Sequence, residues 1–182
     1  MTRPYSFTLL AVTAVTLPLS RAAAQRPAAS DRRFTYSFHV GLAHPLGTMD
    51  SLSDANVHGD IDLSYRLSTT PVKGYFNLKL YGGLNQFTAE PFVAIPHERW
   101  INASLNVQWV LPPTGSGLRP YLELGPGIYW PKSGPSEKGW NVGVGGQIPV
   151  GVFAMEFGVD IHSIQTKPVR RFVTAQLGVL FH

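Results

Sequence analysis

The chain has 182 residues, of which 44% are hydrophobic and only 14% are charged, and its formal net charge is +4. A basic excess this small argues against a nucleic-acid partner. Cysteine is absent, so an exported form of the chain must be stabilised by packing or by backbone hydrogen bonds rather than by disulfides.

The first two dozen residues have the features of an export signal. Arg3 supplies a positive charge, residues 7–17 are mostly apolar, and small alanines at residues 22–24 form a cleavage site. The apolar run is shorter than the roughly 20 residues of a membrane-spanning helix. We therefore expect a cleaved signal peptide over residues 1–24, a flexible leader over 25–33 and one domain over 34–182.

From Phe34 onward, apolar and polar residues alternate with a period of two, which is typical of β-strands with one apolar face. No segment shows a helical period of 3.6 residues. The pattern predicts an all-β chain with eight strands, which cover residues 34–43, 59–67, 74–84, 100–111, 121–130, 140–148, 152–162 and 172–181.

The predicted connections alternate in length. Those after the first, third, fifth and seventh strands are longer, at residues 44–58, 85–99, 131–139 and 163–171. The others, at residues 68–73, 112–120 and 149–151, are shorter on average. Long connections at one end and short turns at the other are typical of an up-and-down β-barrel that crosses an outer membrane.

A closed eight-stranded sheet could be a soluble, lipocalin-like barrel or a membrane barrel, in which the two faces are reversed. The polar faces here are rich in Gly, Ser, Asn and Thr, and the chain has too few charges to cover a water-exposed wall. We therefore expect the apolar faces to point toward lipid. Four tryptophans at predicted strand ends are expected to form aromatic belts, with Trp100, Trp130 and Trp140 near the long connections and Trp109 near the short turns.

Pro126 lies in the middle of a predicted strand on the lipid side. A proline cannot donate to the hydrogen-bond ladder, and a closed barrel has no free strand edge. The sequence therefore predicts a β-bulge at this position.

Four stretches resemble the small eight-stranded outer-membrane barrels of the OmpA and OmpX type: RPYLELGPGIY (119–129), WNVGVGG (140–146), FGVD (157–160) and AQLGVLF (175–181). The resemblance covers nearly all of the expected mature chain. It implies a monomeric transmembrane barrel in the outer membrane of a Gram-negative cell envelope, with a structural or adhesive role. It also implies that Phe181, the penultimate residue, is the aromatic signal read by the barrel-assembly machinery.

Charged residues on the inward-facing positions are expected to form a plug of ion pairs, because an unpaired ion in a narrow lumen is very costly. From their positions along the strands, we place Arg66, Glu123 and Glu156 toward the short turns, Lys79 near the middle, and Asp62, Asp160 and His162 toward the long connections. A second hypothesis is a proton-sensitive gate at Asp160 and His162.

An enzyme is the competing class, since some barrels of this size deacylate lipid A with a serine, a histidine and a carboxylate at the rim. His162 and Ser163 are adjacent in the sequence, so a strand places them on opposite faces. The first long connection also offers polar candidates, which are Asp50, Ser51, Ser53, Asp54 and His58. We expect no catalytic activity.

Binding at the surface is the third possibility. Cations near the long connections could contact the phosphates of lipopolysaccharide, namely Arg99, Lys132, Lys138, Lys167, Arg170 and Arg171. The six histidines have no metal-ligand spacing, so we expect no metal and no other cofactor.

Overall fold

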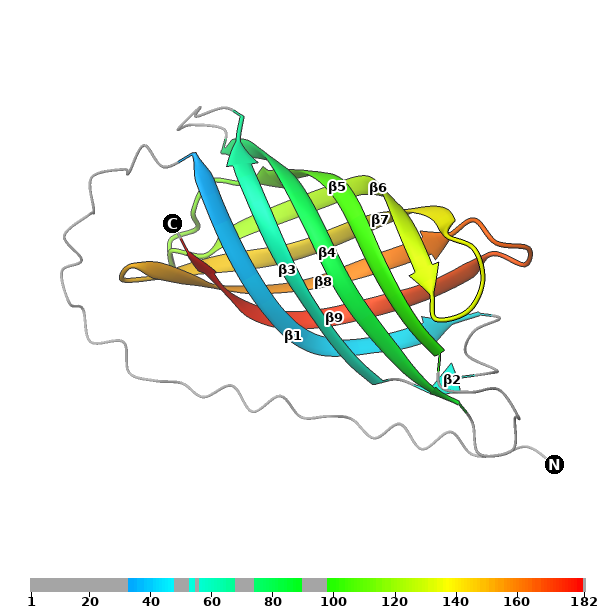
Figure 1. Ribbon diagram of the computed structural model, residues 1–182. Helices are drawn as coiled ribbons and strands as arrows, with labels where there is room; N and C mark the ends of the chain where they lie inside the picture. Colours follow the sequence, from blue (N-terminus) through cyan, green and yellow to red (C-terminus); the bar gives the residue numbers. More distant parts are fainter. Residues whose placement is uncertain (1–32, 48–52, 55, 68–73, 90–97, 182) are drawn as a thin grey trace. The chain divides into compact units, whose positions relative to one another are not determined.

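The computed structural model describes residues 33–47, 53–54, 56–67, 74–89 and 98–181 (Figure 1). The proposed signal peptide, nearly all of the leader and the polar candidates Asp50 and Ser51 lie outside these residues. The strands are β1 (Phe34–Leu46), β2 (Ser53–Asp54), β3 (Asn56–Arg66), β4 (Tyr75–Ala89), β5 (Glu98–Val110), β6 (Arg119–Pro131), β7 (Glu137–Val150), β8 (Phe153–Ile164) and β9 (Arg170–Phe181).

Eight of these strands form a closed antiparallel barrel. Each pairs with its neighbour in the sequence from β3 to β9, and β1 closes the wall by pairing with both β3 and β9. The short β2 pairs only with the end of β4. Because Tyr36 lies opposite Phe181, the start of β1 and the end of β9 share one end of the barrel, which we call the terminal end.

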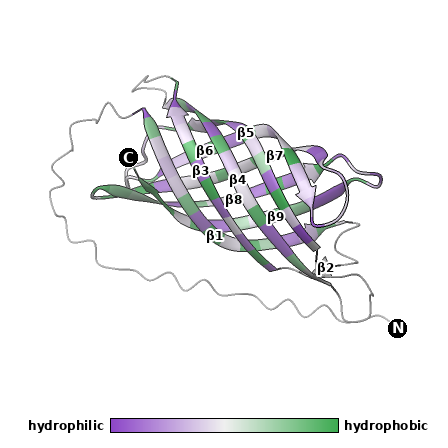
Figure 2. Cartoon of the chain, in the orientation of Figure 1, coloured by the Kyte–Doolittle hydropathy of each residue, from purple (hydrophilic) through white to green (hydrophobic). Residues whose placement is uncertain are grey.

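Hydrophobic and hydrophilic residues alternate along the eight barrel strands (Figure 2), and the burial pattern places them on opposite faces. On β6, Leu122 and Leu124 are 47% and 65% exposed on the outside, whereas Glu123 between them is 3% exposed and points inward. Directly opposed residues of neighbouring strands lie on the same face of a sheet, so the strand pairing continues this contrast around the wall. The outside is apolar and the inside polar, the reverse of a soluble barrel.

The eight predicted strands are confirmed, but several are longer than predicted. The additional residues lie mostly at the end opposite the termini, which we call the loop end, where β3 begins at Asn56 and β7 at Glu137. The connections there shrink to residues 47–55, 90–97, 132–136 and 165–169, against 67–74, 111–118 and 151–152 at the terminal end. The loop-end connections are still longer on average, but the difference is much smaller than predicted, because polar residues at the strand ends continue the backbone ladder without continuing the apolar pattern.

The predicted bulge at Pro126 is also wrong. The ladder between β5 and β6 is interrupted between the Ser104–Gly127 and Val107–Leu124 pairs, but the register is the same on both sides of the gap. Pairing with β7 continues through Pro126 and Trp140. Pro126, which has no N–H, therefore lies in a gap of the ladder with β5, but β6 contains no extra residue there.

The tightest connection joins β7 to β8 through Gly151 and Val152. Gly151 has a φ of +61°, a left-handed conformation that glycine adopts without steric cost and that two-residue hairpins require. Among the described residues, no helix has the length and apolar character needed to cross a membrane.

Aromatic and aliphatic side chains fill the lumen at the loop end. Phe172 contacts Phe87 and Tyr129 edge-to-face, with ring centroids 5.5 and 6.3 Å apart. The guanidinium of Arg170 lies 5.6 Å from the ring centre of Trp100. We call this buried group the apolar plug; it consists of Ala43, Phe87, Trp100, Tyr129, Ile164 and Phe172.

The position of Trp100 corrects the expected aromatic belt. Its side chain is 1% exposed and belongs to the apolar plug, so it cannot lie in a lipid interface. Trp109, Trp130 and Trp140 are 37%, 40% and 44% exposed on the outer face. The alternation of β5 already indicated this outcome, because Trp100 shares its parity with the inward-facing Asn102.

Candidate functional site in the barrel lumen

A buried lysine organises the carboxylates in the middle of the lumen. Lys79 Nζ, on β4, lies 2.8 Å from Asp62 Oδ2, 3.0 Å from Glu123 Oε2 and 3.8 Å from Glu156 Oε1. All four side chains are at most 4% exposed. We call Asp62, Lys79, Glu123 and Glu156 the central ion cluster. Asp62 therefore meets Glu123 and Glu156 at one lysine, and the predicted separation toward opposite ends is wrong.

Amide side chains complete the coordination of Glu123. Asn106 Nδ2 donates to Glu123 Oε1 at 3.1 Å, and Gln108 Nε2 donates to Oε2 at 3.2 Å. Asn77 then donates to Gln108 Oε1 at 2.9 Å. A buried charge is tolerated when it is paired and its remaining lone pairs are satisfied, and these hydrogen bonds supply that satisfaction for Glu123.

A second cluster, closer to the loop end, contains two histidines. His39 Nδ1 on β1 donates to Asp60 Oδ1 on β3 and lies 3.6 Å from Asp62 Oδ2. His58 Nε2 lies 2.7 Å from the other oxygen of Asp60. The three residues His39, His58 and Asp60 are buried, and we call them the histidine–aspartate cluster.

The hydrogen bonds of His58 connect three strands. Its Nδ1 faces Asn85 Oδ1 at 2.8 Å, and its Nε2 faces Gln176 Oε1 at 2.8 Å as well as Asp60. Asn85 uses its amide nitrogen to donate to Asn102, and Gln176 uses its own to donate to Asp160. Both ring nitrogens of His58 therefore lie within hydrogen-bond distance of side-chain oxygens, on β3, β4 and β9.

The proposed gate residues Asp160 and His162 contact different partners. Asp160 Oδ2 accepts a hydrogen bond from Gln176 at 3.0 Å. His162 Nδ1 lies 3.0 Å from the Tyr129 hydroxyl, and its ring stacks on Phe172 with centroids 4.4 Å apart. His162 therefore packs against the side of the apolar plug that faces the terminal end. Asp160 lies farther toward the terminal end, among the polar side chains of the lumen.

Arg66 lies near the terminal end of the barrel and is only partly buried. Its guanidinium carbon is 4.1 Å from the centre of the Tyr75 ring, and Tyr75 donates to Gln147 at 3.4 Å. Arg66 thus makes a cation–π contact with Tyr75 at the terminal end of the barrel. It lies outside the central ion cluster, so the expected ion-pair plug is centred on Lys79.

Sequence reasoning missed the histidine–aspartate cluster, although part of the signal was present. His39 and Asp60 both lie at inward-facing positions of predicted strands. His58 was assigned to the first long connection, but it belongs to β3 and is fully buried. The spacing of the histidines also indicated no ligand set, yet the ligand atoms of His39, Asp60 and Asp62 all lie within 4.8 Å of one another.

At the rim, Ser163 and His162 point to opposite sides of the wall. Ser163 lies between Trp140 and Arg171 in the register, and Trp140 is exposed on the outer face. Ser163 is buried, yet it shares the outer side with these two residues, while His162 points into the lumen. The predicted opposition of the two side chains agrees with this register, and it separates them as a catalytic pair.

Four cations follow the outer apolar surface at the loop end. Arg99, Lys132, Lys138 and Arg171 are exposed, and each is two residues from an outward apolar position, so each points outward. Lys132 and Arg99 are joined by a backbone hydrogen bond of 2.8 Å. We call these four residues the basic girdle. Arg170 points inward, and Lys167 is exposed in the connection between β8 and β9.

The closed antiparallel wall, the apolar exterior and the filled polar lumen together define the fold of the small eight-stranded outer-membrane β-barrels. No protein-family model matches the sequence, and no curated protein shows significant similarity to it. The comparison with solved structures therefore defines the fold of this chain.

Three solved structures illustrate the similarity. Neisserial surface protein A matches with a TM-score of 0.62 and 11% identity over 82% of this chain and 97% of its own. The outer membrane enzyme PagL matches with a TM-score of 0.52 and 11% identity over 81% of this chain and 99% of its own. Ail from Yersinia pestis, determined in a phospholipid nanodisc, matches with a TM-score of 0.50 and 15% identity over 81% of this chain and 97% of its own.

Proposed function

We propose that this protein is a monomeric barrel of the outer membrane with a structural or surface-binding role, a closed lumen and no catalytic activity. The distribution of side chains carries the proposal: large apolar residues are exposed on the outside of the strands, while charged and amide side chains fill the inside. Such a surface is stable in lipid and insoluble in water. The same distribution argues against a soluble lipocalin-like binder, whose interior would be apolar.

The filled lumen supports a role other than solute transport. The apolar plug occupies the loop end, and buried Val110, Tyr121, Ala154 and Leu180 lie toward the terminal end. Between them lie the central ion cluster and the histidine–aspartate cluster. An eight-stranded barrel has just enough room for such side chains, so the interior acts as a core.

The basic girdle supports lipopolysaccharide as the lipid partner. Three of its cations lie two residues beyond the exposed residues Ile101, Trp130 and Trp140, close to where the headgroups of a bilayer would begin. Arginine and lysine bind phosphate oxygens through charge-assisted hydrogen bonds. Girdle cations placed on strands β5, β7 and β9 can contact phosphates of lipids packed against the wall.

Two structural features support assembly as a monomer through the barrel-assembly machinery. The closed wall leaves no unpaired strand edge to join a second copy. Phe181 ends β9, and its ring stacks on Tyr36 with centroids 5.2 Å apart. The aromatic signal thus lies at the seam where the last strand meets the first.

The alternative function is a lipid-modifying enzyme, since PagL, described as an outer membrane enzyme, shares this fold. Such an enzyme would need a serine, a histidine and a carboxylate converging at the outer rim. His162 and Ser163, the nearest candidates among the described residues, lie on opposite sides of the wall. Incubation of the folded protein with lipid A and mass analysis of the products tests this alternative, and loss of an acyl chain would establish it.

Lipopolysaccharide binding tests the proposed partner. The folded wild-type protein in mild detergent is titrated with lipopolysaccharide and with the same lipid after removal of its phosphates. We expect the double variant Lys138→Gln/Arg171→Gln to bind the phosphorylated lipid about tenfold more weakly, equivalent to roughly 1.4 kcal/mol. Arg119→Gln, at the terminal end, is the control and should bind like the wild type. Equal affinity for both lipids would contradict the proposed partner.

A further inference from the structure

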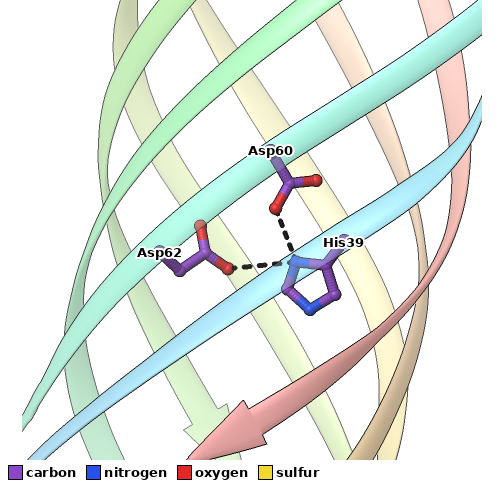
Figure 3. A group of neighbouring side chains, drawn as sticks. All are labelled: His39, Asp60 and Asp62. Carbon is purple, nitrogen blue, oxygen red and sulfur yellow. Dashed lines mark hydrogen bonds and ion pairs between the residues drawn. The ribbon is translucent and has the colours of Figure 1, made fainter.

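Two neighbouring strands bring one imidazole and two carboxylates to a common point in the lumen. His39 comes from β1, and Asp60 and Asp62 come from consecutive inward positions of β3, which pairs with β1 (Figure 3). Both carboxylates point toward Nδ1 of His39. A single N–H can be directed well to only one of them, so one carboxylate is left at a longer distance.

The spacing of these atoms approaches that of ligands around a metal ion. Nδ1 is hydrogen-bonded to Asp60 Oδ1 and lies 3.6 Å from Asp62 Oδ2. Zinc binds histidine nitrogen and carboxylate oxygen at about 2.1 Å, which places tetrahedral ligands roughly 3.4 Å apart. Small rotations of the Asp60 and Asp62 side chains would therefore bring one nitrogen and two oxygens to equal distances from a common centre.

The buried charges around this point are strongly unbalanced. Five carboxylates are buried in the lumen, those of Asp60, Asp62, Glu123, Glu156 and Asp160. Among the described residues, Lys79 is the one buried lysine or arginine, and the histidines His39 and His58 lie next to Asp60. The buried carboxylates therefore outnumber the buried cationic side chains, and such a lumen favours an added cation over an added anion.

Three atoms of buried side chains next to the site also have no hydrogen-bond partner in the described part of the chain: Asp62 Oδ1, His39 Nε2 and Glu156 Oε1. Glu156 is 1% exposed, and its Oε1 points at the His39 ring, 3.9 Å from Nε2. Buried polar atoms without a hydrogen-bond partner need an explanation, and an ion bound at this point would supply one.

Neighbouring residues already orient the carboxylates, as the outer-shell partners of metal ligands do. His58 bonds to Asp60 Oδ2 at 2.7 Å, and Ser37 donates to Asp62 Oδ2 at 3.2 Å. Lys79 shares Asp62 with the site, but it keeps Glu123 as a partner at 3.0 Å. The Asp62 oxygen nearest His39, Oδ2, is the one that Lys79 and Ser37 already bind. We therefore assign Oδ1, which has no hydrogen-bond partner among the described residues, as the metal ligand, reached by rotation about the terminal carboxylate torsion, which is soft.

We propose that His39, Asp60 and Asp62 bind one divalent transition-metal ion in the lumen, with water completing its coordination. A mixed set of one imidazole and two carboxylates suits zinc or a neighbouring first-row ion better than calcium or magnesium, which prefer oxygen ligands alone. The ion replaces the proton on His39 Nδ1 and balances part of the negative charge of the lumen.

The burial of the site determines how the ion enters. The side chains of His39, Asp60 and Asp62 are 0% exposed, and the apolar plug lies between them and the loop end. A folded barrel therefore neither takes up nor releases the ion quickly. The ion binds while the barrel closes and is then retained against chelators.

The test compares folding in the presence of zinc with addition of zinc after folding. The chain, without a histidine tag, is folded into mild detergent both ways, washed with EDTA and analysed for metal by mass spectrometry. We expect about one zinc per folded chain when zinc is present during folding, and at least tenfold less when it is added afterwards. Cobalt should substitute for zinc and give visible absorption bands, whereas magnesium and calcium should not be retained.

Variants assign the ion to this site. Asp62→Asn and His39→Asn should each retain at least about tenfold less zinc, while His162→Asn, in the layer beneath the apolar plug, should retain as much as the wild type. Faster mobility of unboiled samples in SDS verifies that each variant is folded. Folded wild-type protein with less than roughly 0.1 zinc or cobalt per chain would overturn the proposal, as would equal zinc retention in a folded Asp62→Asn variant. The wild-type result decides the question even if both variants fail to fold.

Discussion

At the scale of single residues, the stability of the lumen depends most on Lys79. Its ammonium is within 4 Å of three carboxylates from three strands. Removal of one partner from a buried ion network leaves the remaining charges uncompensated. The resulting loss of stability is larger than the stability that the intact network adds relative to an apolar core. Lys79 therefore balances charge and also joins β4 to β3, β6 and β8 through their side chains.

This arrangement predicts the effect of Lys79→Met, which keeps the length of the side chain but removes its charge. We expect unfolding in lipid vesicles to require about 3–5 kcal/mol less free energy, measured by urea titration with tryptophan fluorescence. Lys132→Met, on the exposed basic girdle, is the control and should change stability by less than about 0.5 kcal/mol. A loss below about 1 kcal/mol for Lys79→Met would show that the carboxylates are neutralised by other means.

The position of a residue along a predicted strand indicates whether its side chain enters the lumen, but not which other side chains it contacts there. Asp62 and His162 were both expected near the long connections. His162 does lie toward that end, stacked on Phe172, whereas Asp62 lies against Lys79. Trp100 shows the opposite case: its parity in the strand indicated the lumen, and the tendency of tryptophan to lie at interfaces was the weaker guide. In a strand, parity determines the face, whereas residue type is only a preference.

At the scale of the strands, alternation determines which face meets lipid. Leu124 is 65% exposed in the middle of β6, and its neighbours Glu123 and Gly125 point inward. A charged residue on the lipid-facing side is costly in the middle of a bilayer and nearly neutral at its edges. The outer face is therefore the part of a strand that a membrane constrains most.

Substitution of this face predicts a depth-dependent result. Leu124→Arg should lower the free energy of unfolding in lipid vesicles by about 2–4 kcal/mol. Val152→Arg is the control, because Val152 is 86% exposed in the turn between β7 and β8, and its effect should stay within about 0.5 kcal/mol. If the barrel carrying Leu124→Arg were as stable as the control in vesicles, this face would not contact the hydrocarbon of the bilayer.

The ends of the strands were the least predictable part of the fold. β3 begins at Asn56 and β7 at Glu137, so polar residues that were expected in connections, such as His58 and Lys138, lie in strands. Backbone pairing with a neighbouring strand extends these elements, and the apolar pattern that marks the middle of a strand carries no information about it. For the same reason, the contrast between long and short connections is smaller than expected.

At the scale of the whole molecule, closure is the property with the largest consequence. Each of the eight barrel strands is paired on both sides, and β1 pairs with β9 over eleven residues from Tyr36 to Leu46. In lipid, unpaired backbone groups cost several kcal/mol each, so a closed ladder cannot open one strand at a time without a large penalty. The barrel should therefore unfold slowly and as a unit.

Closure predicts heat-modifiable mobility in gels. The chain folded in mild detergent should run faster in SDS without boiling than after boiling, because the compact barrel resists SDS while the boiled chain is extended. The boiled sample of the same preparation is the control for chain length. Identical mobility of both samples, together with solubility in the absence of detergent, would contradict a closed membrane barrel.

The sequence by itself determined the number of strands, their antiparallel class and the face that each presents to lipid. These properties follow from a local period of two residues and from the difference in polarity between lipid and lumen, so a single strand carries the information. The resemblance of four short stretches to small outer-membrane barrels pointed to the same fold.

Only the tertiary structure decided which buried groups form a site. His58 and Gln176 are separated by 118 positions and yet lie 2.8 Å apart, because the pairing of β1 with both β3 and β9 brings the two ends of the chain together. The convergence of His39, Asp60 and Asp62 likewise depends on the register between β1 and β3. Strand register and barrel closure are collective properties of the whole ladder, so no local pattern contains them.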